Sequence, residues 1–418
     1  ASAIVLGRMK MSTMIFAAAM CRSTMAFFAP SHLRQSSSRL FSVSIADVQM
    51  GVSRVETLQS MLSVHGAPGS VGCKKEGDLE PIFVSSSDDD TPELINQMMG
   101  IDEYVNIHPQ LYPLARSKET GNLICALRRA FADDTSEWYE NSSNAPFPIV
   151  EAQVGGVGMR LLALNSELLM RRIVCECDFS GKDKELVKMY NDGLGKGTIL
   201  DKGLDEPYES GSVEKLGYGV DRYVLLRVGP FADIYESLAL GHAEKGDESS
   251  SLISAEAANG KISGFASTFL FYARLLNKFP NRSEESRDAA RMCLRLPLPS
   301  IGMSIDDFRD VAVIGQLAEE SDSDEEVMAK LQTMYEKMRE NEKDEDPRAA
   351  ANKSPEQAAI DQATYLLDTV ALTGGNWAAA RPKLAEIYKS AGRDDLAKFV
   401  NPKSSQRQKF ESRKRYVC

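Results

Sequence analysis

The sequence predicts an α+β fold, in which a small mixed α/β region is followed by a predominantly helical C-terminal part. Short apolar segments bounded by glycine, proline and polar residues predict strands at residues 122–128, 148–154 and 159–164. Beyond residue 231, apolar side chains recur instead at helical spacing, and four of them share one face: Phe265, Phe269, Tyr272 and Leu276. Capping residues recur through this second part, so we expect it to consist of successive helices.

Residues 1–46 have the composition of a targeting segment. A short apolar run from Met14 to Cys21 leads to the small residue Ala26, as in a secretory signal peptide. The run is too short to span a membrane. Residues 27–46 contain arginine and serine but no aspartate or glutamate, which is typical of a transit peptide. We expect processing between Ala26 and Phe27. The alternative is an ordinary secretory signal followed by an unstructured start of the mature chain.

The junction A-F-F-A-P at residues 26–30 separates these two segments. It resembles the junction in the bipartite presequence of nucleus-encoded plastid proteins in diatoms and related algae. The resemblance implies a plastid location, in the stroma or at the stromal face of the thylakoid. It also implies a mature chain that begins near residues 42–47.

Charge and composition limit the possible partners. The chain has 418 residues and a net charge of −11, and an acidic protein does not bind a nucleic-acid backbone generically. We therefore expect no nucleic-acid partner. The mature part has no apolar segment long enough for a transmembrane helix, so we expect a soluble body, with peripheral attachment to the thylakoid left open. Beyond the presequence there are only three histidines, His65, His108 and His242, which argues against a histidine metal cage.

The N-terminal half divides into two expected units. Residues 47–90 should hold a short helix and an acidic linker; a capping box at residues 53–56 opens the helix, and Gly66 follows its end. Residues 91–235 should form the mixed α/β region. Within it, Thr91 caps a helix and Ser166 caps another. A further strand is expected at 223–228.

The C-terminal half divides into three expected units. Residues 236–345 should be helical, with one helix capped by Ser283 and a charged last helix capped by Ser323. That last helix carries a narrow apolar stripe, formed by Val327, Leu331, Met334 and Met338. Residues 346–401 should form helical hairpins that begin at the cap Ser354. Residues 402–418 are rich in lysine and arginine and should be a disordered basic tail.

Two glycine-rich segments superficially suggest nucleotide binding. Residues 193–198 place a lysine between glycines before a threonine, but Tyr190 stands where the phosphate-loop motif needs its first glycine. We interpret this segment as the end of a helix followed by a turn. Residues 155–158 lack the glycine spacing of a dinucleotide loop, and we interpret them as a tight turn between strands.

Cys175 and Cys177 form the most notable pair among the seven cysteines. On a helix, residues two apart point in different directions and do not share a metal ion. We interpret both as buried free thiols. Whether they are redox active stays open, because reactivity depends on exposure and on nearby charge. We nominate no catalytic residue, no cofactor-binding residue, no cofactor and no metal ligand.

Four segments carry a resemblance to a known family: Y-P-L-A-R-S-K-E-T-G-N-L-I-C-A-L-R-R (112–129), G-V-G-M-R-L-L-A-L (156–164), Y-V-L-L-R-V-G-P-F-A-D-I-Y-E-S-L-A-L-G-H-A-E-K-G-D (223–247) and S-P-E-Q-A-A-I-D-Q-A-T-Y-L-L-D (354–368). They resemble a conserved family of chloroplast proteins of plants and algae whose members are associated with photosystem II accumulation. The region matching residues 297–301 is tryptophan-rich in the plant proteins but has no tryptophan here.

The resemblance implies a non-enzymatic plastid accessory factor that supports assembly or accumulation of a thylakoid photosynthetic complex through protein–protein contacts. Two alternatives remain. One is a soluble stromal enzyme with a site in the α/β region. The other is a peripheral structural subunit of a plastid complex.

Overall fold

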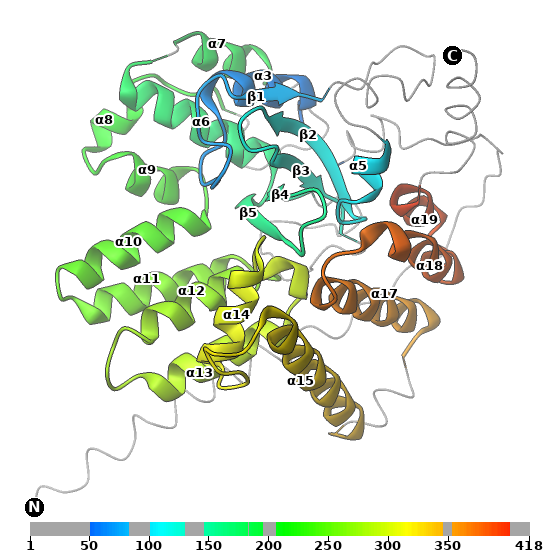
Figure 1. Cartoon of the computed structure of the whole chain (residues 1–418). Helices are drawn as coiled ribbons and strands as arrows, with labels where there is room; N and C mark the ends of the chain where they lie inside the picture. The colour runs from blue at the N-terminus through cyan, green and yellow to red at the C-terminus, as the bar shows by residue number, and fades with distance from the viewer. Residues whose placement is uncertain are drawn as a thin grey trace, which may run out of the picture.

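The computed structural model describes residues 51–82, 101–129, 146–182, 184–194, 206–345 and 353–401. At its centre is a five-stranded antiparallel sheet whose strands lie in chain order (Figure 1). The strands are β1 (Leu79–Pro81), β2 (Leu111–Ser117), β3 (Leu123–Leu127), β4 (Ile149–Ala152) and β5 (Met159–Ala163). Helices surround the sheet and make up most of the chain after it. The predicted α+β class with a helical C-terminal part is confirmed.

The three strands expected from the sequence are β3, β4 and β5. Every residue of β3 and of β4 is buried, which explains why these strands are continuous apolar runs and not alternating ones. The sequence did not reveal β1 and β2. Pro113 lies inside β2, where a proline argues against a strand, and the register shifts between Pro113 and Ala115 to accommodate it. The linker expectation is wrong at residues 66–82, because β1 and the buried Cys73 lie there.

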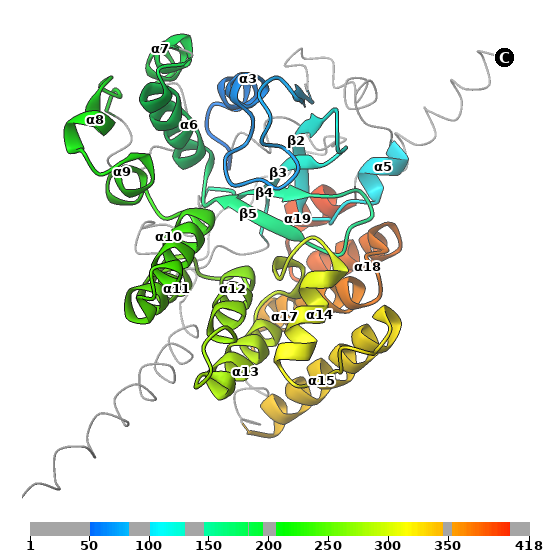
Figure 2. The same cartoon turned by 60° about the vertical axis from the view of Figure 1, so that its left-hand side comes forward.

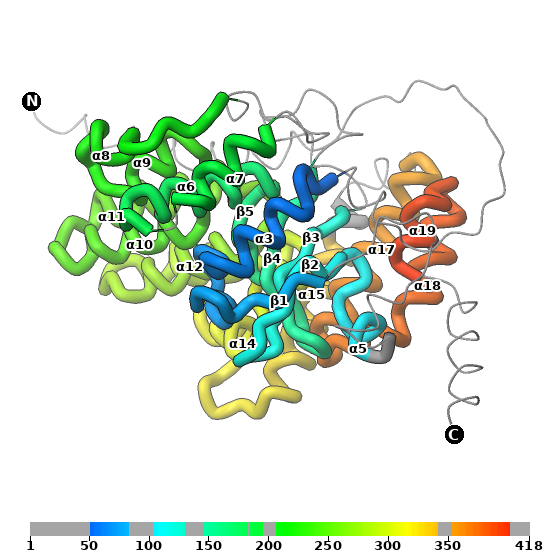
Figure 3. Tube along the Cα trace, turned by 90° about the horizontal axis from the view of Figure 1, so that it is seen from above, coloured from blue at the N-terminus to red at the C-terminus, as the bar shows by residue number. Residues whose placement is uncertain are grey.

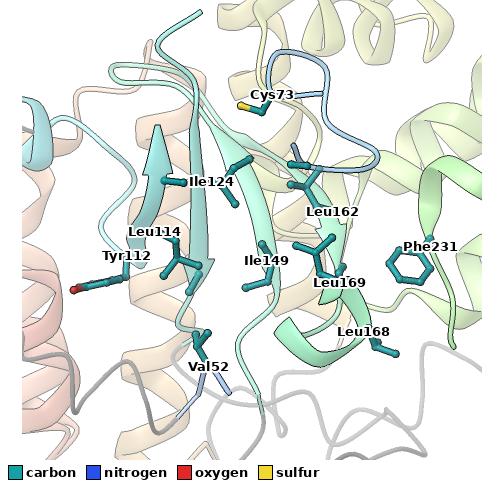
Figure 4. Packing of buried hydrophobic residues seen from close by; sticks show 14 of the residues in the cluster. Val52, Cys73, Tyr112, Leu114, Ile124, Ile149, Leu162, Leu168, Leu169 and Phe231 are labelled. Atoms are coloured by element: carbon teal, nitrogen blue, oxygen red, sulfur yellow. The ribbon is translucent and has the colours of Figure 1, made fainter. Parts of the chain in front are cut away.

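The two faces of the sheet are covered differently. Helix α3 (Val55–His65) packs on β1 and β2, and helix α6 (Ser166–Ser180) packs on β5 and on α3. Leu114, Ile124, Ile149 and Leu169 all belong to this layer (Figure 4). The opposite face packs against Phe265, in the connection between the helices at residues 248–261 and 267–276. Burial on both faces makes the sheet the centre of the molecule.

A lobe of helices stands at the β5 end of the sheet. It consists of α6, α7 (Lys184–Asp192), α8 (Ser212–Leu216) and α9 (Val220–Arg227). The strand expected at 223–228 is therefore wrong. A short apolar run does not distinguish a strand from a helix by periodicity alone. Here Tyr223 and Val224 are buried while Leu226 and Arg227 are exposed, so one side of a short helix faces the core.

The rest of the chain forms a series of helices, in which neighbours in sequence are neighbours in space. The first part comprises α10 (Ala232–Glu244), α11 (Glu248–Lys261), α12 (Ser267–Leu276), α13 (Ser283–Met292), the 3-10 turns η2 (Cys293–Arg295) and η3 (Leu298–Ser300), α14 (Ile305–Ile314) and α15 (Asp324–Glu345). The second part comprises α17 (Pro355–Leu372), α18 (Trp377–Ser390) and α19 (Asp394–Val400). Figures 2 and 3 show the series passing around the sheet, with α17–α19 on the side opposite the α6–α9 lobe.

Short helix α5 (Ile101–Val105) precedes β2 and contacts α18. One hydrophobic cluster includes residues of α3, the sheet, α6 and α17–α19, such as Leu62, Ile149, Ile173 and Trp377. The helical C-terminal part is thus packed onto the sheet and shares its core.

The expected helix caps were only partly correct. Ser323 and Ser354 accept hydrogen bonds from backbone N–H groups three residues later, and the stripe at Val327 and Leu331 is buried. Ser53, Ser166 and Ser283 do not occupy the cap position; Arg54, Asn165 and Arg282 do. Asn165 accepts a hydrogen bond from the Leu168 N–H, whereas Arg54 adopts a left-handed backbone with φ of 51°.

Some expectations lie outside the described residues: the helix beginning at Thr91, the presequence and the basic tail. Within the described part of the chain, no helix is both long and apolar enough to cross a membrane.

Candidate functional site

The glycine-rich segments act as turns where they are described. Residues 155–158 connect the antiparallel strands β4 and β5, and Gly155 has a φ of 72° that favours glycine. The Gly193 N–H donates to the carbonyl oxygens of Met189 and Tyr190, at the end of α7. Residues 195–200 lie outside the description. The expected processing residues Ala26 and Phe27 also lie outside the described ranges.

Cys175 and Cys177 are both buried and are not in disulfides. They belong to helix α6 and face different neighbours. The Sγ of Cys177 lies 3.3 Å from Nδ1 of His65, which is the last residue of α3. No group of three or more His, Cys, Asp and Glu side chains within the described ranges is arranged to hold a metal ion.

His65 is held between Cys177 and an acidic neighbour. Its Nε2 lies 3.1 Å from a carboxylate oxygen of Glu176, which is adjacent to Cys177 on α6. Burial alone would lower the pKa of His65, but the hydrogen bonds to Cys177 and Glu176 outweigh burial and raise it to about 10. A helix C-terminus also favours a cation. His65 is therefore an imidazolium at neutral pH.

Arg172 lies one turn before Glu176 on α6 and fixes the position of the Glu176 carboxylate. Its Nε donates to Glu176 at 2.8 Å, and its two terminal nitrogens donate to the carboxylate of Asp233 at 2.7 and 2.6 Å. Asp233 lies in the first turn of α10, so the cluster connects α3, α6 and α10. We call these five residues, His65, Arg172, Glu176, Cys177 and Asp233, the thiol–imidazole cluster.

Sequence reasoning identified Cys177 but not its partners. His65 is 112 residues away, and nothing in local spacing indicates that the end of α3 lies against α6. The usable signal was weak: His65 directly precedes Gly66, so it lies at a predicted helix end where a histidine is favoured as a cation.

A second polar region joins the C-terminal helices to α5 and to the helices before them. Arg381 of α18 is buried and donates four hydrogen bonds to backbone carbonyls, those of Tyr104, Val105, Ile107 and Val400. The distances run from 2.7 to 2.9 Å, and burial lowers the pKa of Arg381. The guanidinium thus fixes the end of α19, the end of α5 and the segment directly after α5 against α18.

Asp368 performs a similar role at the other end of this region. One of its oxygens accepts a hydrogen bond from the Leu298 N–H at 2.8 Å, and the other accepts from the Tyr335 hydroxyl at 2.6 Å. These bonds join α17 to η3 and α15. Burial raises the pKa of Asp368 to about 7, although Tyr335, the Leu298 N–H and the charge of Arg339 each act to lower it.

The fold defines the class of protein: an α+β chain in which a small antiparallel sheet anchors a long series of helices. Two sequence families match this helical part, one described as PAB middle domain at residues 232–318 and one as PAB C-terminal domain at residues 331–404. The chain is also 31% identical to the Arabidopsis thaliana protein named Protein IN CHLOROPLAST ATPASE BIOGENESIS, chloroplastic, over 295 residues. The match covers 69% of this chain and 78% of the Arabidopsis protein. The chain belongs to the family of that protein. No solved structure matches it.

Proposed function

We propose that this protein is a plastid accessory factor that supports biogenesis of the chloroplast ATPase by binding a protein component of that complex. The observation that carries the proposal is the family relationship to the Arabidopsis protein, whose name refers to chloroplast ATPase biogenesis. The sequence resemblance suggested photosystem II as the client. The name of the relative directs the proposal to an ATPase instead.

We place the client-binding surface on the helical part. The two matched family regions, 232–318 and 331–404, both lie there and not on the sheet. These helices pack against the sheet and against each other on their inner sides, so their outer sides form a long surface that suits a protein partner. Arg381 and Asp368 hold this series in one arrangement, so its outer surface is preorganised for binding.

The proposed location is the plastid, at the stroma or the stromal face of the thylakoid. It rests on the composition of residues 1–46 and on the word chloroplastic in the name of the relative. Fusing residues 1–46 to a fluorescent protein should direct it into plastids, whereas the same fusion with Phe27→Ala should stop at an earlier membrane. Plastid import of both fusions would exclude a role for Phe27.

The test of function is co-purification from isolated plastids with a tagged chain, with stroma and mildly solubilised thylakoids analysed separately. Recovery of ATPase subunits in partly assembled complexes would support the role of an accessory factor in biogenesis. Recovery of the tagged chain in equal numbers with the complete ATPase would indicate a structural subunit. Recovery of photosystem subunits would identify a photosystem as the client instead of the ATPase. If the chain is recovered alone and turns over a small metabolite, the alternative of a stromal enzyme is favoured.

A further inference from the structure

The thiol–imidazole cluster places one cysteine in an environment unlike that of the others. We propose that His65 activates Cys177 for thiol–disulfide exchange, so that Cys177 is a site of reversible modification by a glutathione-type disulfide. The juxtaposition that carries the proposal is the 3.3 Å contact between the Cys177 Sγ and His65 Nδ1, with Glu176 on the other nitrogen of the ring. The proposal is independent of the proposed function.

The cluster favours a positive charge beside the sulfur. Glu176 contacts the far nitrogen of His65, and the end of helix α3 adds a partial negative charge. Arg172 keeps Glu176 in place, because it is itself held by two hydrogen bonds from its terminal nitrogens to Asp233. An imidazolium next to a cysteine stabilises the thiolate, which is the form that attacks disulfides.

The other cysteines of the described ranges provide an internal comparison. Cys73, Cys125, Cys175, Cys177 and Cys293 are all 0% exposed, so simple exposure does not distinguish them. Burial raises the pKa of Cys73, Cys175 and Cys293 to about 12, and raises that of Cys125 as well. Cys73 and Cys293 have only oxygen atoms as hydrogen-bond partners. Cys177 instead faces an imidazole nitrogen.

Access to Cys177 requires movement of His65. The His65 side chain contacts the buried sulfur and is itself 16% exposed, so its displacement would open a route from solvent to Cys177. It is the terminal residue of α3, and Gly66 directly after it has a φ of 84°. Fraying of the last turn of a helix is a low-energy local opening. Such fraying would expose the sulfur without disturbing the sheet.

The proposed reaction consumes one molecule of glutathione disulfide and needs no other oxidant. The Cys177 thiolate attacks one sulfur of glutathione disulfide, a new S–S bond forms and the old S–S bond breaks. The second glutathione leaves as a thiolate and takes a proton from water, to which Cys177 lost its own proton when the thiolate formed beside the imidazolium of His65. The net products are a mixed disulfide on Cys177 and one reduced glutathione. The modification adds a charged tripeptide at the contact of α3 and α6.

The experiment measures site-specific labelling of the full chain by iodoacetamide, followed by mass spectrometry of each cysteine. We expect Cys177 to react at least about tenfold faster than Cys175 at about pH 6 to 7. His65→Gln should abolish this excess at about pH 6, so that Cys177 then reacts as slowly as Cys175, whose pKa burial raises to about 12. Incubation with glutathione disulfide should modify Cys177 first.

Controls separate activation from unfolding. Cys175→Ser should leave Cys177 labelling unchanged, and Glu176→Gln should reduce it at about pH 6. If His65→Gln unfolds the chain, labelling of Cys73, Cys125 and Cys293 rises together, and the Glu176→Gln result then decides. The proposal is overturned if Cys177 in the unaltered chain reacts no faster than Cys175, or if its excess survives both substitutions.

Discussion

The indole nitrogen of Trp377 donates a 2.8 Å hydrogen bond to the carbonyl oxygen of Gly156, 221 residues earlier in the chain. Trp377 begins α18, and Gly156 lies in the turn between β4 and β5. His108 packs edge-on against the same indole, with ring centroids 4.6 Å apart. Burial, with a smaller effect from the charge of Arg381, lowers the pKa of His108 to about 3, so His108 is neutral in this contact. At this turn, therefore, the first residue of α18 is hydrogen-bonded to the loop between two strands of the sheet.

Substitution of Trp377 should weaken this junction. Trp377→Phe keeps most of the apolar contact but leaves the Gly156 carbonyl without its donor, which should lower the free energy of unfolding by about 1 to 3 kcal/mol. Trp377→Ala also opens a cavity and should cost about 3 to 5 kcal/mol. Urea unfolding followed by circular dichroism measures both. Leu226→Ala, at a side chain 65% exposed, is the control and should stay within about 0.5 kcal/mol. If Trp377→Phe lowered the unfolding free energy no more than Leu226→Ala does, the hydrogen bond to Gly156 would have no stabilising role.

Gly158 tests how closely two backbones approach at the same turn. A Cβ at Gly158 would lie 2.2 Å from the Gly302 oxygen and 2.4 Å from the Pro299 oxygen, and backbone atoms do not move aside easily. Gly158→Ala should therefore destabilise the fold by about 1 to 3 kcal/mol. Gly241→Ala, within α10 and with open space around it, should instead stabilise by about 0.5 to 1 kcal/mol. Thermal unfolding of the two variants checks the opposite signs, and a harmless Gly158→Ala would mean that the two loops separate freely.

The sequence was sufficient for elements whose patterns are local. The caps Ser323 and Ser354 and the apolar stripe at Val327 and Leu331 depend on residues within two helical turns. Strand β2 and helix α9 were not predicted correctly, because Pro113 argues against a strand and residues 223–228 fit either structure by composition. In both cases tertiary packing overrides local preference.

The contacts that form the candidate site are not local. His65 and Cys177 are 112 residues apart, and Arg381 reaches carbonyls 274 to 277 residues away. A single sequence contains no signal for such pairs. Their residue types are also uninformative, because a buried arginine is satisfied here by main-chain oxygens and not by an acidic side chain. What the sequence predicted about Cys177, a buried free thiol, is confirmed.

Asp368 should make stability depend on pH. Its ordinary pKa is 3.8, and in the folded protein it is raised to about 7. Between these values the folded chain keeps a proton that the unfolded chain has lost, so this group makes the free energy of unfolding fall as pH rises from about 4 to about 7. Above about pH 7 the contribution is constant. Asp368→Asn removes the titration, and it should be more stable than the unaltered chain at about pH 8 by at most about 4 kcal/mol.

The measurement is the difference in unfolding free energy between Asp368→Asn and the unaltered chain across this pH range. Asp395→Asn is the control, because the pKa of Asp395 is shifted in the opposite direction. Burial alone would raise the pKa of Asp395, but Arg393 and Arg128 outweigh burial and lower it. Its stabilising contribution is present above the ordinary pKa of 3.8 and is lost as pH falls. A pH-independent difference for Asp368→Asn would show that Asp368 does not titrate near neutral pH.

The position of the client on the helical series can be tested with two exposed aliphatic side chains. Ile253 of α11 is 63% exposed and lies inside the matched family region, whereas Leu226 of α9 is 65% exposed and lies outside it. A charge buried in an interface without a partner costs several kcal/mol, so Ile253→Glu should reduce recovery of ATPase subunits at least about tenfold. Leu226→Glu should leave recovery unchanged. Both substitutions should leave the melting temperature nearly unchanged, because both side chains face solvent. Full recovery with Ile253→Glu would remove this face of α11 from the client surface, and equal losses with both variants would argue against a surface confined to the family region.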